Sequence, residues 1–167
     1  KGKLITLSTE TDRTLFFDFL PLSLGEIRGF KTRFHLYTVP GKVSYDASRK
    51  LILKGVDGIV FVYDADPKQL VANLQSWRGM QANLKDQGYD WKTMPIVVQV
   101  DTHRFKGAVS TPTIARDLGV GDRPLFVADP STGQGVFDTL KAVAKGVLLE
   151  LKKGATDAGA DIRTVEF

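Results

Sequence analysis

The stretch from Thr32 to Asp66 combines a strand-like segment, a glycine turn and a second, buried strand. In the first strand, side chains at alternate positions share one face as far as Thr38, and a sharp Pro40-Gly41 turn follows. The apolar run Ile59–Val62 is typical of a strand covered on both faces, which occurs mainly in parallel α/β sheets. Ligands of such sheets collect at the carboxyl ends of the strands. We therefore predict that function lies near Val39 to Lys42.

The composition excludes several kinds of site. The chain has no cysteine and two histidines, His35 and His103, so disulfides, zinc-thiolate centres, all-histidine metal sites and cysteine nucleophiles are ruled out. A bound metal would be held by oxygen ligands. The net charge of +4 comes from cations that are spread along the chain without an aromatic-basic ladder. We therefore predict no nucleic-acid partner.

The length and apolar content fit one globular domain. Of the 167 residues, 43% are hydrophobic and 25% are charged, which is ordinary for a protein with a real core. No apolar run approaches the roughly 18 residues of a membrane-spanning helix, and the first ten residues lack the zones of a secretory signal. We expect a cytoplasmic protein with no integral membrane segment.

The N-terminal part predicts short strands. Leu4–Leu7 and Leu15–Leu20 have strand character, with the polar segment Ser8–Thr14 as a loop between them. Residues Leu22–Glu26 predict a turn into a further strand, Ile27–Val39. These first strands would supply an antiparallel edge.

Asp18 is the one polar residue in the Leu15–Leu20 strand. It is either a solvent-facing residue of an edge strand, the more frequent case, or an acid that faces a partner.

From Arg49 onward, helices and strands alternate. A short helical piece carries Arg49 and Lys50, and three strand-helix pairs follow. Asp66 and Pro67 open a helix that Gly88 ends, with an apolar face. The remaining segments are a strand at Pro95–Val100, a helix from Thr111 to Gly119, a strand at Pro124–Ala128 and a final helix through Leu151. Alternation of this kind predicts βαβ units and a mostly parallel sheet with flanking helices.

Three blocks of sequence resemble the MglA family of bacterial Ras-like small GTPases, the polarity switches of gliding and pilus-driven motility. They are DRTLFFDFLP (Asp12 to Pro21), GFKTRFHLYTVPG (Gly29 to Gly41) and YDASRKLILKGVDGIVFVYD (Tyr45 to Asp64). The resemblance continues to about Lys152. It implies a Ras-like P-loop NTPase fold over residues 1–153, and we treat residues 154–167 as a flexible tail because their sequence loses periodicity.

The resemblance implies a role for several residues in binding GTP or GDP with Mg²⁺. Thr14 matches the magnesium-binding switch threonine, and its hydroxyl is a hard oxygen ligand. Arg13 matches an arginine that stabilises charge on the transferred phosphoryl group. Thr38 and Gly41 match the second switch, where glycine lets a backbone N–H approach phosphate. Asp101 and Ser131 are the remaining candidate nucleotide contacts.

Two residues depart from the family pattern. Lys42 stands where the family has a water-positioning glutamine, and a lysine cannot accept a hydrogen bond from water as an amide does. It can still neutralise phosphate charge. Asp101-Thr102-His103-Arg104 stands where an Asn-Lys-x-Asp loop reads guanine, so Arg104, which has no acceptor, replaces the carboxylate that reads the base. Guanine specificity should fail, with His103 a solvated loop residue.

A third departure is an absence. The motif Gly-x-x-x-x-Gly-Lys-Ser/Thr does not occur in this sequence, and the resemblance implies that roughly thirty residues carrying a first strand, phosphate loop and helix come before the position of Lys1. Either those residues are missing from the sequence, or the first strand is absent and a partner fills the gap.

Three functions remain open. The first is a degenerate MglA-like switch that acts by binding partners, the second a competent GTPase whose phosphate loop is missing from these residues, and the third a structural subunit that recruits a chain by strand pairing. The resemblance implies a Roadblock-type dimer, like the family's MglB, and polarity or motility effectors as partners, with recruitment to a cell pole. We place the dimer at Phe17, Asp18 and Phe19.

Overall fold

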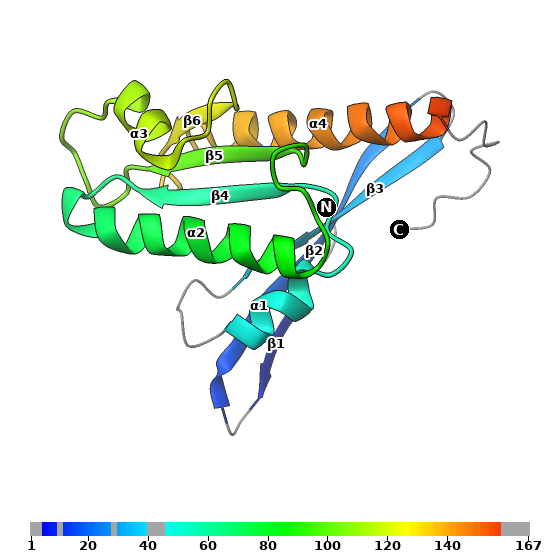
Figure 1. Ribbon diagram of the computed structural model, residues 1–167, viewed down its shortest axis with the longest axis horizontal. Helices are drawn as coiled ribbons and strands as arrows, with labels where there is room; N and C mark the ends of the chain where they lie inside the picture. The colour runs from blue at the N-terminus through cyan, green and yellow to red at the C-terminus, as the bar shows by residue number, and fades with distance from the viewer. Residues whose placement is uncertain (1–4, 10–11, 28–29, 40–45, 158–167) are drawn as a thin grey trace. The chain divides into compact units, whose positions relative to one another are not determined.

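A computed structural model of the protein describes residues 5–9, 12–27, 30–39 and 46–157 (Figure 1). The chain divides into two compact units between Gly55 and Val56. The first unit contains an antiparallel sheet and one helix, and the second contains a parallel sheet with helices on both of its faces.

The first unit is built on a three-stranded antiparallel sheet. Its strands are β1 (Ile5–Thr9), β2 (Asp12–Ile27) and β3 (Phe30–Tyr37), in the order β1-β2-β3. Two residues separate each strand from the next, and connections this short can join antiparallel strands but not parallel ones. The helix α1 (Asp46–Leu53) follows and contains the helical piece predicted around Arg49.

The start of β2 corrects one prediction. The polar segment Ser8–Thr14 was expected to be a loop, but β1 runs to Thr9 and β2 begins at Asp12. Thr9 pairs with Asp12 across the two strands. The hydrogen-bond ladder therefore continues through polar residues whose local preference is for loops, because strand preference depends more on the neighbouring strand than on the residue itself.

The predicted turn at Leu22–Glu26 is also wrong. These residues lie inside β2, which pairs with β3 as far as Ile27 opposite Phe30. The register shifts between Ser23 and Glu26. The glycine in this segment thus accompanies an irregularity in the ladder, which is a common place for glycine within a strand.

The second unit is built on a parallel sheet. Its strands are β4 (Ile59–Asp64), β5 (Ile96–Asp101) and β6 (Leu125–Ala128), in the order β4-β5-β6. All three were predicted. The middle strand β5 is buried from Ile96 to Val100, as expected for an apolar strand with a neighbour on each side and a helix over each face.

Helices cover both faces of this sheet, which Figure 1 shows between α2 (Leu70–Asp86) and α4 (Val136–Asp157). Phe61 of β4 meets Trp77 of α2 edge to face, with ring centroids 4.9 Å apart. Gly58, just before β4, lies against Val147 of α4. Successive residues of an extended chain point to opposite faces, so odd and even positions contact different helices. Leu84, Val98 and Val100 are fully buried in this core.

The helix ends follow the predicted signals. Asp66 accepts a hydrogen bond of 2.9 Å from the N–H of Lys68 and caps the 3-10 turn η2 (Pro67–Gln69), which leads into α2. Helix α3 (Thr111–Leu118) ends at Gly119, whose φ of 65° is left-handed. Such a residue closes a helix at little cost when it is glycine. Helix α4 continues to Asp157, past Lys153 where the periodic sequence ends.

The α/β class and the parallel sheet with flanking helices are confirmed. The antiparallel strands predicted for the N-terminal part are β1, β2 and β3, which pair with one another among the described residues. Their short connections dictate pairing with each other, whereas β4, β5 and β6 are joined through helices, which permits parallel pairing. In the described part of the chain, no helix has the length and apolarity needed to cross a membrane.

Candidate functional site

An aspartate stands at the carboxyl end of each parallel strand. Asp64 ends β4, Asp101 ends β5 and Asp129 follows β6. Each carboxylate accepts a hydrogen bond from the N–H two residues later, at 3.0 Å for Asp66, 2.8 Å for His103 and 3.0 Å for Ser131. This local bond stabilises a turn immediately after the strand. The three aspartates therefore hold their own loops in place.

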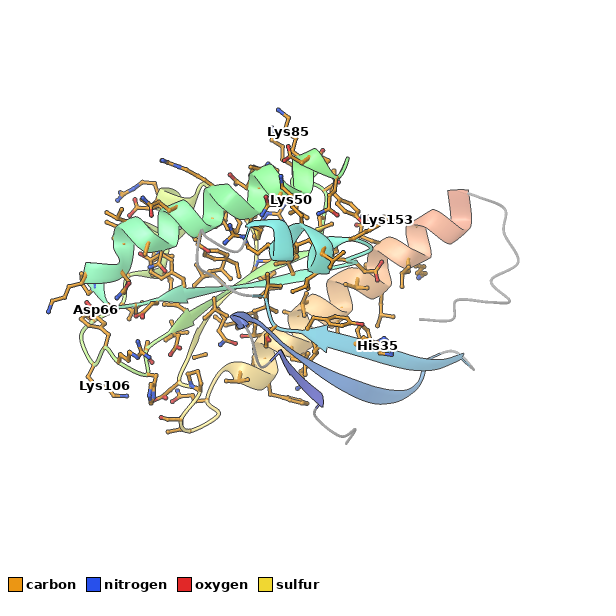
Figure 2. All side chains as sticks on the ribbon, turned by 90° about the horizontal axis from the view of Figure 1, so that it is seen from below. His35, Lys50, Asp66, Lys85, Lys106 and Lys153 are labelled. Atoms are coloured by element: carbon orange, nitrogen blue, oxygen red, sulfur yellow. The ribbon has the colours of Figure 1, made fainter. Side chains whose placement is uncertain are left out.

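The loops after β5 and β6 are also joined to each other. Thr102 donates to the carbonyl of Ala128 from its N–H at 2.9 Å and from its hydroxyl at 3.1 Å. Lys106 Nζ lies 3.0 Å from Asp129 Oδ2, and the Ser131 hydroxyl donates to Asp129 Oδ1. We call Thr102, Lys106, Asp129 and Ser131 the strand-end cluster. Figure 2 shows Lys106 at the same end of the second unit as Asp66.

The cluster strongly favours an ionised Asp129. The pKa of its carboxyl is lowered from 3.8 to about 2, chiefly by the Ser131 hydroxyl and then by Lys106. The Asp129 side chain is 14% exposed, whereas Lys106 is 72% exposed. Both carboxylate oxygens of Asp129 thus accept hydrogen bonds from this chain, which leaves Asp129 poorly suited to accept hydrogen bonds from a ligand.

Gly135 fixes the loop that follows the cluster. Its φ is 72°, and a Cβ at this position would lie 2.2 Å from the carbonyl oxygen of Val127. Only glycine permits this close approach of loop backbone to β6. The Gly135 carbonyl accepts from the N–H and hydroxyl of Thr139, at 3.1 and 2.9 Å, and starts α4.

Two predicted nucleotide contacts lie at these strand ends. One carboxylate oxygen of Asp101 accepts a hydrogen bond from the N–H of His103, and the hydroxyl of Ser131 donates a hydrogen bond to Asp129. The side chain of His103 is 54% exposed, with Nδ1 3.9 Å from Asp129 Oδ1. Arg104 is exposed as well. The hydroxyl of Ser131 is thus engaged in a hydrogen bond within this chain.

The remaining predicted residues belong to the first unit. Arg13, Thr14, Phe17, Asp18 and Phe19 all lie in β2, where Asp18 pairs with Thr6, and Phe19 pairs with Ile5 on one side and Tyr37 on the other. Thr38 follows β3 and is exposed. Pro40, Gly41 and Lys42 lie outside the described residues.

The failure of guanine recognition stays a prediction, argued from the hydrogen-bond acceptors that these loops offer. The base presents two adjacent donors, which require a carboxylate with free acceptors, and Arg104 offers none. Asp101 holds its own loop, and Asp129 is bonded to Ser131 and Lys106. For magnesium, the described residues contain no group of three or more histidine, aspartate or glutamate side chains placed to hold an ion, and Thr14 stays a predicted ligand.

Sequence reasoning missed Asp129 and Lys106. Both lie in segments recognised as loops, but they are 23 residues apart, and nothing in their local sequence marks them as partners. A usable signal was the position of Asp129, directly after a predicted core strand, since neighbouring parallel strands bring their C-terminal loops together.

The sequence closely matches one curated relative. It is 62% identical over 154 residues to the mutual gliding-motility protein MglA of Myxococcus xanthus strain DK1622, an alignment that covers 92% of this chain and 79% of the relative. No family model matches the chain.

Proposed function

We propose that this chain, which belongs to the MglA family of Ras-like small GTPases, is a polarity or motility switch that has lost guanine recognition and acts through protein partners. Membership in the family carries the Ras-like α/β fold and implies descent from nucleotide-binding proteins. The proposal concerns what remains of the nucleotide site in this member.

The observation that carries the proposal is the Lys106–Asp129 contact of 3.0 Å in the strand-end cluster. It joins the loop where the family reads guanine to the loop after β6, and it occupies a carboxylate that lies beside that position in the sheet. With Arg104 in the reading position, both oxygens of Asp129 and one oxygen of Asp101 accept hydrogen bonds from this chain, so few acceptors are left for the base. A site that loses a required hydrogen-bond partner loses discrimination of about ten-thousand-fold.

The sequence of the second switch supports the same proposal. Lys42 replaces the glutamine that the family uses to position water. Its ammonium donates hydrogen bonds and accepts none. It therefore attracts phosphate charge but does not orient an attacking water.

The partner part of the proposal concerns β2. Phe17, Asp18 and Phe19 lie in one of the blocks that match the family, and we propose that a Roadblock-type dimer of the MglB kind docks there. The switch would act in the cytoplasm and be recruited to a cell pole through such partners.

One observation favours the alternative of a competent GTPase. The identity of 62% to the relative agrees with the resemblance in which Arg13, Thr14 and Gly41 match the family's arginine, switch threonine and second-switch glycine. In that case a phosphate loop in the full-length protein would supply phosphate binding, and Arg13 would assist hydrolysis.

Nucleotide binding by the full-length protein distinguishes the proposed degenerate switch from a competent GTPase. We expect labelled GTP and ATP, titrated with Mg²⁺, to bind with affinities within about threefold of each other, or not at all. The triple variant Asp101→Asn, Thr102→Lys, Arg104→Asp rebuilds the reading loop, and with Asp129→Ala it should prefer GTP by about tenfold or more.

The control is the single variant Asp129→Ala, which removes the internal contact without rebuilding the loop and should show no preference. Tight, guanine-selective binding by the unaltered protein, with phosphate release, would overturn the proposal. A gain of GTP turnover on Lys42→Gln alone would show that the rest of the site is intact.

A further inference from the structure

An open pocket of about 560 Å³ lies at the C-terminal end of α2, away from the strand-end cluster. Arg78 and Lys85 line it from α2, and Tyr89, Trp91 and Lys92 line it from the following loop. We call these five residues the α2-end pocket. Figure 2 shows Lys85 extending outward from the end of α2.

The loop side of the pocket is held rigidly. Arg123, from the segment before β6, donates to the carbonyls of Met94 and Lys92 at 2.8 Å each and to the carbonyl of Trp91. Its guanidinium lies 5.6 Å from the centre of the Trp91 ring, and that ring meets Trp77 edge to face at 5.9 Å. A pocket wall fixed before binding loses little entropy when a ligand arrives.

The pocket carries an excess of positive charge. Arg78, Lys85 and Lys92 are exposed, and among the described residues none of their side chains forms an ion pair. Asp90 also lines the pocket, and one of its carboxylate oxygens accepts a hydrogen bond of 3.0 Å from the N–H of Lys92. The pocket lining thus holds three positively charged side chains and one carboxylate, and that carboxylate is engaged in its own turn.

The spacing of the cations indicates the size of the ligand. Arg78 and Lys85 are seven positions apart on α2, about 10 Å along the helix axis. One phosphate group is too small to meet both. Tyr89 and Trp91 are half-buried, and the ring surface that they leave open in the pocket suits an apolar side chain. The complementary ligand therefore carries acidic groups on either side of an apolar one.

We propose that the α2-end pocket binds an acidic segment of a partner protein, with carboxylates on Arg78, Lys85 and Lys92 and an apolar side chain against Trp91 and Tyr89. This interaction does not depend on the nucleotide site. It gives the switch a second contact surface, formed entirely within the second unit.

The test uses a synthetic peptide, acetyl-Asp-Glu-Leu-Leu-Asp-Glu-Leu-amide, titrated into the full-length protein while the indole resonance of Trp91 is followed by NMR. We expect saturable shifts at Trp91 and Tyr89 that weaken as salt is raised, because the contacts are between exposed charges. The same peptide with asparagine and glutamine in place of its acids should not bind. Inorganic phosphate and a short DNA oligonucleotide are the competing probes.

Reversing the charge of two pocket residues tests whether the peptide binds at the α2-end pocket. The double variant Arg78→Glu, Lys85→Glu should weaken peptide binding by about tenfold or more. The matched control is Lys68→Glu, Lys145→Glu, which makes the same change in net charge at exposed positions outside the pocket and should keep the affinity within about twofold. Equal loss in both variants, equal binding of the neutral peptide, or stronger shifts with phosphate or DNA would each overturn the proposal.

Discussion

At the scale of single residues, the strand-end cluster shows how the chain pairs the polar groups of its own loops. Asp129 receives hydrogen bonds from Ser131 and Lys106, and the pKa of its carboxyl falls to about 2. The sequence identified Asp101 and Ser131 as candidates from their place after core strands. It could not show that Ser131 serves Asp129, because that depends on the turn that brings the two side chains together.

We expect the Asp129 carboxyl to titrate near pH 2, measured by carbon NMR of the side chain. A lowered pKa means that the folded state favours the ionised form, so this contribution to stability is fully present above about pH 4 and is lost as pH falls towards 2. Ser131→Ala should raise the midpoint more than Lys106→Met does, since the serine hydroxyl is the larger cause of the shift.

Lys141→Met is the control, because Lys141 lies over the ring of Phe137 on α4 and should leave the midpoint unchanged. A titration near the ordinary value of 3.8 in the unaltered protein would show that the cluster does not form in solution. Stability measured by denaturant should differ between the protein and Asp129→Asn at pH 6 and converge near pH 2.

At the scale of elements, local signals determined the second unit well. Capping by Asp66, the left-handed Gly119 and the apolar runs of β4 and β5 are all local in sequence, and each element was found where these signals place it. The first unit was harder to predict. The length of β2 depends on the ladders it forms with β1 and β3, and a ladder is a property of neighbouring strands rather than of one segment.

Gly135 offers a test of how the loop after β6 is positioned. Gly135→Ala would place a Cβ 2.2 Å from the carbonyl oxygen of Val127 at a φ of 72°, and we expect it to lower the free energy of unfolding by more than roughly 3 kcal/mol. Gly133→Ala is the matched control. Its φ is 82° with no atom within 4 Å of the added carbon, so it should cost only about 1 kcal/mol of left-handed strain.

Denaturant unfolding of both variants measures the difference. Equal losses would mean that the contact with β6 does not constrain the loop and that backbone conformation alone explains both effects.

At the scale of the whole molecule, the proposed function requires protein partners. The relative with 62% identity is named for gliding motility, and the switch proposed above would act through two docking surfaces. The proposed surfaces lie in separate units, at β2 and at the α2-end pocket, so each can be tested by changing one unit alone.

We expect Asp18→Lys to weaken binding of a Roadblock-type dimer of the MglB kind by about tenfold, because it reverses the charge in the middle of the proposed docking strand. Isothermal titration calorimetry measures the affinity. Asp122→Lys makes the same charge change at an exposed loop position of the second unit and should leave the affinity unaltered. An unchanged affinity for Asp18→Lys would refute the placement of the dimer on β2.

The sequence alone determined the α/β class, through local periodicity, and the family, through residue identity over the resembling blocks, whereas the role of Arg104 stays a prediction. The tertiary structure decided which strands pair and which side chains meet. Short connections joined β1, β2 and β3 into their own sheet, and the adjacency of β5 and β6 brought Lys106 to Asp129 across 23 residues. Contacts between distant segments depend on strand order and register, which a single sequence does not specify.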